Sequence, residues 1–285
     1  MALSTQTAPE LTQEQVANIL VKPLADQSVF LSAGPRIFDT HSMLRIPKLG
    51  AATDPSWVPE NGLIPEVEAD FDEVRLLPDT LESIKTIARF SSELARQSVV
   101  ALDATLKDRL VTDVANKLDH QLLSATGDGI NTPRGLFAYD NAQKLAIDGA
   151  LALDDLHDAV GLAMGENVNT SACKWLMRSS DFVNLRKVKD TGGNYIVQSD
   201  VTQAGSYSLL GIPVIVTNRI PTGYAGLVDF SQIAVARDLA PSVKWLDQRY
   251  AEYDQIGLRV VTRYDAAPLN AEAVIHLTGV GTTEA

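Results

Sequence analysis

The chain carries one long excursion, in which two extended segments surround a loop-like tip, and a long helical segment follows it directly. The excursion runs from Met43 to Phe90, and its tip reads Asp-Pro-Ser-Trp-Val-Pro-Glu-Asn-Gly over residues 54–62. Residues 91–126 then contain neither Gly nor Pro. Loops this long in compact domains are usually functional or disordered. Because a globular enzyme gains little from an arm that leaves its core and returns, this order of segments favours a subunit that contacts its neighbours.

The composition is that of a folded, acidic protein. A chain of 285 residues can bury a sizeable core, and its 45% hydrophobic and 21% charged content argues against disorder. The formal net charge of −12 opposes binding to nucleic acid through counterion release, which needs clustered Lys and Arg. The single cysteine, Cys173, excludes an intrachain disulfide. No apolar run approaches the ~20 residues that span a bilayer, and no secretory signal is recognisable, so we expect a protein without a membrane partner.

Residues 1–42 are only weakly patterned. Residues 11–20 have the spacing of a short amphipathic helix, which Pro23 would end because proline cannot continue a helix interior. Two interpretations stay open for this region: an arm that lies on a neighbouring subunit, or a frayed terminus.

Three extended segments are predicted inside the excursion, at residues 43–47, 71–76 and 83–90, because apolar and polar side chains alternate there. Carboxylates crowd the approach to the second segment, and four of them recur at a spacing of two: Glu66, Glu68, Asp70 and Asp72. In an extended strand these four side chains point the same way and repel one another. The pattern fits a contact with a basic surface of another subunit, or a strand face that is simply solvated.

The segment after the excursion predicts one long helix. Its apolar side chains recur every four residues and comprise Leu102, Leu106, Leu110, Val114, Leu118 and Leu122. Asp119 is assigned to the polar sides of this amphipathic helix. Ser91 or Ser92 is the predicted N-cap and Gly127 the predicted C-cap, with an interruption near residues 97–98 left open.

The rest of the chain alternates and then turns to strand. The predicted elements are a helix at residues 153–164, a strand at 174–177, a helix from 180 that ends in a basic run, a strand at 209–217, and mostly strand from 226 to 278. Neither an internal repeat nor a low-complexity tract is found. The fold class is therefore α+β.

A search for chemistry finds no catalytic, cofactor-binding or metal-binding set. The four histidines are scattered, and the acidic residues around His157 are better explained as a solvated helix start than as an ion site. Residues 127–129 lack the lysine and the spacing of a phosphate-binding loop. Cys173 is interpreted as a small buried residue rather than a nucleophile. We therefore expect a protein that is not an enzyme.

Several stretches, in their order and spacing, resemble the major capsid protein of tailed double-stranded DNA bacteriophages, which has the Hong Kong 97-type fold. They are Trp57-Val58-Pro59-Glu60-Asn61-Gly62, the strand and helix start at residues 87–94, the helix exit at 123–136, Leu210-Gly211-Ile212-Pro213-Val214, residues 228–231 and Arg263-Tyr264-Asp265-Ala266. No single motif is specific, but together they cover nearly the whole chain.

The resemblance implies a four-part organisation. An N-terminal arm would occupy residues 1–42, and the excursion at 43–90 would be the E-loop, which overlaps an adjacent subunit. A P-domain with a long spine helix would comprise residues 91–132 and 226–285. The A-domain, which lies at the centres of hexamers and pentamers, would comprise 133–225.

The function that the resemblance implies is structural. The chain would self-assemble into hexamers and pentamers of an icosahedral head that encloses double-stranded DNA without sequence-specific binding. Its partners would be copies of itself, together with separate scaffolding, portal and decoration proteins. It would be a virion component assembled in the cytoplasm of the bacterial host, and it would use no cofactor.

Two departures from some family members shape these expectations. Residues 51–84 contain no lysine, and Lys48 lies near the base of the excursion, so we predict a shell without a lysine–asparagine isopeptide crosslink. The chain begins with the short arm, without room for the ~100-residue scaffolding segment of some members, so a separate scaffold is expected.

Contacts between subunits are expected where the four carboxylates meet basic residues of a neighbour. The candidate basic residues are Arg109 and Lys117 on the spine and Arg186, Lys187 and Lys189 after it. Exposed pairs contribute only ~0–1 kcal/mol each, so these pairs would set register more than stability. Three alternatives remain: an encapsulin-like nanocompartment shell, a soluble α+β enzyme, and a tail or decoration protein.

Overall fold

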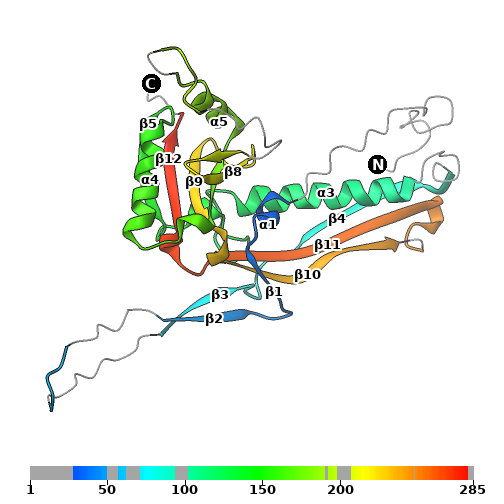
Figure 1. The fold of residues 1–285 in the computed structure, drawn as a ribbon. Coiled ribbons are helices and arrows are strands. Elements are labelled where there is room, and N and C mark those ends of the chain that lie inside the picture. The colour runs from blue at the N-terminus through cyan, green and yellow to red at the C-terminus, as the bar shows by residue number, and fades with distance from the viewer. Residues whose placement is uncertain are drawn as a thin grey trace.

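The structure is a computed structural model, and it describes residues 28–49, 57–61, 71–93, 102–189, 192–197, 207–246 and 248–281. A four-stranded sheet, a six-stranded sheet and a two-stranded hairpin make up its β structure. One long helix lies along the four-stranded sheet, and the hairpin projects from the body (Figure 1). This mixture of helix and sheet agrees with the predicted α+β class.

The first described elements lie within the predicted arm, residues 1–42. Helix α1 spans Val29–Ser32, and strand β1 spans Arg36–Asp39. Strand β1 pairs in parallel with β10, so the chain joins the sheet within its first described residues. The predicted helix at residues 11–20 lies outside the described part of the chain.

The hairpin consists of β2 (Leu44–Leu49) and β3 (Phe71–Leu76), which pair in antiparallel register. Both strands were predicted from their alternating side chains. The third predicted segment is also a strand, β4 (Ile84–Ser91), but it pairs with β11 in the four-stranded sheet rather than with the hairpin. The projecting part of the excursion therefore ends at the root of β3.

The four-stranded sheet has the order β1-β10-β11-β4. Its two long central strands are β10 (Ile233–Leu246) and β11 (Gln255–Pro268). They pair in antiparallel register, with irregularities between Arg237 and Ser242 in β10. Side chains alternate along β4, so one face of this sheet lies towards the helix and the other faces away from it.

Helix α3 (Leu102–Leu122) is the predicted long helix, as far as it is described. Val114, Leu118 and Leu122 of the predicted stripe are buried. Two predictions about this helix are wrong. Asp119 is not on a polar side but is completely buried, and the helix ends at Leu122, so Gly127 is not its C-cap.

Gly127 has a different role from the one predicted. It has a φ of +117°, and a Cβ on it would lie 2.3 Å from the carbonyl oxygen of Pro133. The glycine therefore permits the loop after α3 to fold tightly back on itself.

The six-stranded sheet has the order β5-β12-β9-β6-β8-β7. Its strands are β5 (Gln143–Gly149), β6 (Cys173–Met177), β7 (Ser208–Leu209), β8 (Ile212–Val216), β9 (Gly223–Asp229) and β12 (Val274–Val280). Helices α4 (Leu153–Gly165) and α5 (Ser179–Arg186) belong to the same half of the molecule (Figure 1). The range expected for the A-domain is residues 133–225. Strand β9 begins at the end of this range and β12 lies well after it, yet both share a sheet with strands from inside the range.

One strand prediction in this half is wrong. Residues 209–217 form the tight hairpin β7–β8 instead of one strand, because Leu210 and Gly211 at its turn have φ values of 54° and 77°. Short 3-10 turns complete the connections, at Leu136–Ala138, Thr170–Ala172, Phe230–Gln232, Ala251–Tyr253 and Ala271–Ala273.

Two large apolar cores hold the molecule. One lies between α3, α1 and the four-stranded sheet, where it includes Phe30, Leu118, Leu122 and Tyr264. It extends to Leu176, Val228 and Val274 of the six-stranded sheet. The other lies under α4 and α5 and is centred on Trp175, which is fully buried. The hairpin is thus the part of the described chain that leaves both cores.

Candidate assembly surfaces

The hairpin presents its tip away from the rest of the molecule. The described tip residues 57–61 lie far beyond the ends of β2 and β3 (Figure 1). The Trp57 side chain at this tip is 103% exposed. A fully exposed indole is unusual in a monomer and marks a surface that contacts another molecule.

Charged side chains line both strands of the hairpin. Lys48 lies opposite Asp72 in the register, whereas Arg45 lies opposite Arg75. Arg75 forms an ion pair with Glu73 of its own strand. Asp72 is exposed, and its Oδ1 accepts a hydrogen bond of 2.8 Å from the Glu73 backbone N–H. The other three predicted contact carboxylates, Glu66, Glu68 and Asp70, lie outside the described residues.

A buried clamp holds the root of the hairpin. Leu77 has a left-handed φ of 55°, and its backbone N–H donates a 2.9 Å hydrogen bond to Oδ2 of Asp265. Arg263 donates to the carbonyl oxygen of Pro78 and, at 3.3 Å, to Asp238. Leu76, Leu77 and Leu81 pack around this clamp on Ala234, Ala236 and Ala267. The turn out of the hairpin is therefore fixed by both hydrogen bonds and apolar contacts.

The electrostatics of this root are dominated by burial. Burial raises the pKa of Asp265 to about 6, against the lowering effects of the N–H groups of Leu77 and Ala266 and of the nearby Arg263. The Nε of Arg263 is buried without a hydrogen-bond partner in the described part of the chain. The Arg-Tyr-Asp-Ala stretch contributed to the family resemblance, but no pattern in the sequence predicted that its residues form this clamp.

A second clamp fastens the N-terminal segment to α3. Asp119 accepts hydrogen bonds from the Ser28 hydroxyl at 2.5 Å, the Val29 N–H at 2.7 Å and the Phe30 N–H at 3.3 Å. The Phe30 ring then packs edge-on against Phe230, with ring centroids 5.7 Å apart. The segment that begins at Ser28 is therefore held at a fixed point on the long helix.

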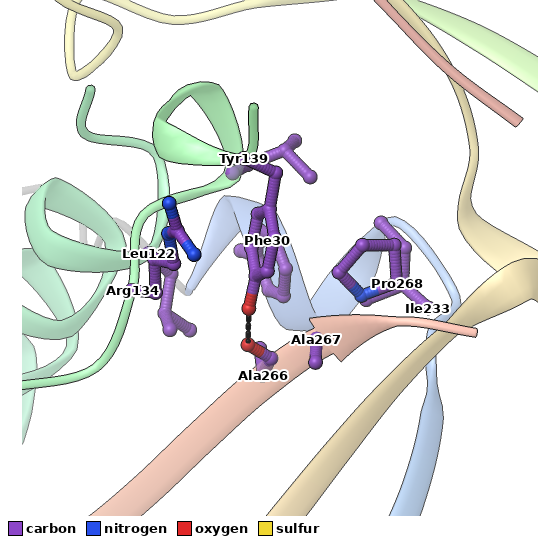
Figure 2. Close-up of a pocket in the computed structure, with 9 residues that line it drawn as sticks. Phe30, Leu122, Arg134, Tyr139, Ile233, Ala266, Ala267 and Pro268 are labelled. Carbon is purple, nitrogen blue, oxygen red and sulfur yellow. Dashed lines mark hydrogen bonds between the residues drawn. The ribbon is translucent and has the colours of Figure 1, made fainter. Parts of the chain in front are cut away.

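The junction between α1, α3 and β11 contains a small cavity (Figure 2). Its lining includes Phe30, Leu122 and Ile233, and the Tyr139 hydroxyl closes one side by donating a 2.8 Å hydrogen bond to the carbonyl oxygen of Ala266. The cavity volume is about 10 Å³, which is no more than one water molecule requires. This junction is a packed joint rather than a ligand site.

The predicted contact residues on the long helix are exposed. Arg109 forms an ion pair with Asp113 at 3.1 Å, one turn along α3. Lys117 lies at a groove of about 480 Å³ between α3 and β4, which Leu110, Val114 and Tyr264 also line. Helix α3, which carries both residues, and the hairpin extend to opposite sides of the body, so a contact between this helix and the hairpin carboxylates would require a second copy (Figure 1).

The other predicted basic residues lie around the end of α5. The Arg186 guanidinium is 5.9 Å from the centre of the Tyr207 ring, and the Lys189 amine is 4.8 Å from the centre of the Tyr195 ring. Lys187 is exposed directly after the helix. Six large apolar side chains of this region are also exposed, namely Val183, Val188, Tyr195, Ile196, Tyr207 and Leu210. A basic and apolar patch therefore marks the outer end of this half of the molecule.

The described residues contain no arrangement that suggests catalysis. No group of three or more metal-ligating side chains is found among them, and no described helix is long and apolar enough to cross a membrane. Burial raises the pKa of the Cys173 thiol to about 11, which makes it a poor nucleophile. Asp155, beside His157, accepts a 2.7 Å hydrogen bond from the Ala152 N–H at the start of α4.

Comparison with known sequences gives a match over nearly the whole chain. The model of the phage capsid family matches residues 11–279. The major capsid protein of Klebsiella oxytoca phage phiKO2 is 24% identical over 310 residues, which cover 98% of this chain and 71% of that protein.

Solved structures give the same result for the fold. A chain from Mycobacterium phage Bobi superposes with a TM-score of 0.75 at 21% identity, covering 99% of this chain and 100% of that one. The capsid of a native GTA particle also reaches a TM-score of 0.75, at 15% identity and 94% coverage of both chains. These matches favour a phage capsid over a nanocompartment shell or a soluble enzyme. The chain thus belongs to the phage capsid family: it is a phage major capsid protein with the Hong Kong 97-type fold, a self-associating structural component of the virion rather than an enzyme.

Proposed function

We propose that copies of this chain assemble into hexamers and pentamers that form an icosahedral head around double-stranded DNA. The observation that carries this proposal is the hairpin, which leaves both cores and presents a fully exposed Trp57 at its tip. A projection of this kind has no partner within the described part of its own chain. Many repeated contacts of this type make a strong shell, since linked contacts act at a high effective concentration.

The four-part division remains part of the proposal. Residues 1–42 form the arm, 43–90 the E-loop, 91–132 and 226–285 the P-domain, and 133–225 the A-domain. The root clamp at Leu77 and Asp265 supports an E-loop that moves as a unit with the sheet beneath it. The basic and apolar patch at the end of α5 supports an A-domain that meets its symmetry mates around a capsomer axis.

The proposed contacts pair Glu66, Glu68, Asp70 and Asp72 with basic residues of a neighbour, among them Arg109, Lys117, Arg186, Lys187 and Lys189. Separate scaffolding, portal and decoration proteins are proposed as further partners, and assembly takes place in the cytoplasm of the bacterial host. The DNA is enclosed without sequence-specific contacts, in keeping with a net charge of −12.

The shell is proposed to lack a lysine–asparagine crosslink, because residues 51–84 contain no lysine. Lys48 lies in β2, opposite Asp72, rather than at the hairpin tip. Assembled particles should therefore dissolve into single chains on a denaturing gel. A ladder of covalent multimers would show that a crosslink forms.

Electron microscopy tests the main proposal directly. The chain would be expressed alone and with candidate scaffolding proteins, and the products imaged after sizing by light scattering. Closed icosahedral particles, or sheets and tubes of hexamers, are the expected result. Subunits that stay monomeric with every scaffold tested would contradict the proposal.

A further inference from the structure

The sheet face that carries the hairpin root changes from apolar to charged along its two central strands. Ala236 of β10 and Ala267 of β11 lie on this face, where the root packs on them. Because side chains alternate along a strand, the same face continues through Asp265 and Arg263 of β11 and through Asp238 of β10. The three charged residues therefore lie beside the apolar contact, on the hairpin side of the sheet.

Asp238 occupies an irregular position in β10. In the pairing with β11, the register passes from Arg237 directly to Leu239, so Asp238 has no partner in the ladder. An extra residue of this kind is a β-bulge, which bends its strand and re-aims the side chain that it carries. The Asp238 side chain is only 17% exposed. The bulge therefore places a mostly buried carboxylate at the root of the hairpin.

The two oxygens of this carboxylate face the two ends of the hairpin. On the entry side, Nδ1 of His41, which precedes β2, lies 3.4 Å from Oδ1 of Asp238. On the exit side, the Arg263 guanidinium lies 3.3 Å from Oδ2. The same guanidinium donates a hydrogen bond to the carbonyl oxygen of Pro78, which follows β3. Asp238 thus connects the entry of the hairpin to its exit through one intermediary, Arg263.

Two other polar contacts at the root hold one end each. Asp39 forms an ion pair with Arg237 at the entry, with N–O distances of 2.6 and 2.9 Å. Asp265 accepts the hydrogen bond from the Leu77 N–H at the exit. Neither of these contacts joins the entry to the exit. Removing the Asp238 carboxylate would therefore leave both ends attached to the sheet and break the connection between them.

The direction of the hairpin, which projects from the body, is sensitive to small changes at its root (Figure 1). The apolar contact of the root is non-directional, whereas hydrogen bonds between fixed groups depend on their angles. Strands β2 and β3 have six residues each, which makes them about 20 Å long. A rotation of about 10° at the root moves their outer ends by about 3–4 Å. A displacement of that size separates the partners of an ion pair or a hydrogen bond.

We propose that Asp238 is a positioning residue of the hairpin: by contacting His41 and Arg263 it ties the entry to the exit and fixes the direction in which the hairpin leaves the sheet. The apolar contacts decide where the root packs, and the Asp238 carboxylate decides its angle. This inference rests on the proposed role of the hairpin as a contact between copies. It also assigns a purpose to the bulge in β10.

The distance between two spin labels on unassembled subunits measures the direction of the hairpin. One label is attached through Asp72→Cys at the outer end of β3, and the other through His120→Cys on α3. Both positions are exposed, and the native Cys173 is buried and does not compete for the label. The wild-type root should give one narrow distance distribution. Asp238→Ala should broaden it by about 3–4 Å, as expected for a rotation of about 10° at the root.

Further variants distinguish positioning from a contribution to stability alone. Asp238→Asn has one carbonyl oxygen in place of two carboxylate oxygens and should give an intermediate width. His41→Ala removes the entry contact at an exposed ring and should also broaden the distribution. Combined with Asp238→Ala it should add no further width, because both changes break the same connection. The matched control Asp113→Ala removes the ion-pair partner of Arg109 on α3, away from the root, and should leave the width unchanged.

The outcomes separate this inference from the proposed function. A wild-type width in folded Asp238→Ala, or equal broadening in Asp113→Ala, would overturn the inference. If urea titration shows that Asp238→Ala does not fold, a wild-type width in Asp238→Asn would overturn it instead. Under conditions in which the wild-type chain forms shells, Asp238→Ala should form fewer closed ones, and a normal yield would contradict the positioning role. A wild-type chain that forms no shell contradicts the proposed function, whereas the label distances still decide the inference.

Discussion

Replacing Asp119 by Ala removes the acceptor that holds the start of the described chain on the long helix. Three donors lose their partner at once: the Ser28 hydroxyl and the N–H groups of Val29 and Phe30. Two of these hydrogen bonds are short, at 2.5 and 2.7 Å, and the Asp119 side chain is completely buried. The hole left behind is therefore lined by donors that water reaches poorly.

The expected cost follows from these contacts. A net hydrogen bond is worth roughly 1 kcal/mol, and a buried donor without a partner costs roughly 1–3 kcal/mol more. The desolvation cost of burying the carboxyl group disappears in the variant, which offsets part of this loss. We expect Asp119→Ala to lower the free energy of unfolding by about 2–4 kcal/mol. Asp119→Asn should cost about 1–2 kcal/mol, because its amide can satisfy two donors but faces the Val29 N–H with a donor of its own.

Urea titration of unassembled subunits measures these changes, and hydrogen exchange locates them. In Asp119→Ala, the amides of Val29 and Phe30 should exchange faster than those of the distant helix α4. Ser28→Ala, which removes only one donor, is the matched control and should cost about 1 kcal/mol. The double variant should cost less than the sum of the two single variants, since both act on one network. An Asp119→Ala chain with wild-type stability and unchanged exchange at these amides would refute the clamp.

Further predictions concern pH and backbone space. Burial lowers the pKa of His276 to about 4, so the free energy of unfolding should fall by up to ~3 kcal/mol as pH drops from about 6.5 to 4. Urea titrations of His276→Gln should show a smaller fall over this pH range. Equal falls in the wild-type chain and in His276→Gln would contradict the prediction. Burial raises the pKa of Asp265 to about 6, so its contribution has the opposite sign: stability is present below about 3.8 and is lost as pH rises through about 6. The stability of Asp265→Asn, measured relative to that of the wild-type chain, should therefore be higher at pH 7 than at pH 4. Thermal unfolding at both pH values checks this. A Cβ on Gly135 would lie 2.1 Å from the Ser124 carbonyl oxygen, so Gly135→Ala should cost at least ~1–3 kcal/mol. A Cβ on Gly161 in α4 would have no atom within 4 Å, so Gly161→Ala should stabilise the protein by up to about 1 kcal/mol. Melting temperatures that shift in the same direction for Gly135→Ala and Gly161→Ala would refute this contrast.

The elements that the sequence predicted well are those whose signal is local. The four-residue stripe of α3 and the alternation in β3 and β4 are properties of neighbouring residues, so their periods alone identify helix and strand. The partner of β4 is not local. Its alternating pattern suits the hairpin as well as it suits β11, and only the packing of sequence-distant strands decides between them.

The same distinction explains the clamps that sequence reasoning missed. Asp119 has the position of a solvated residue on an amphipathic helix, and it is buried only because Ser28, 91 residues away, folds over it. Asp265 and Leu77 meet across 188 residues. A carboxyl group that binds backbone N–H groups leaves no periodic trace in the sequence. The polar residues that position the arm and the hairpin were therefore the hardest to predict.

The strength of these clamps has a consequence for how a shell of such subunits is held together. The segment that begins at Ser28 and the hairpin are fixed at their roots by buried groups, so each subunit holds these two proposed contact segments at defined positions before it meets a neighbour. Preorganised surfaces lose less conformational entropy on association. The contacts themselves can then remain weak and exposed, at ~0–1 kcal/mol for each ion pair. Weak contacts break and re-form, which allows a misplaced subunit to leave. A geometry set within the subunit and an affinity distributed over many contacts are together what an accurate closed shell requires.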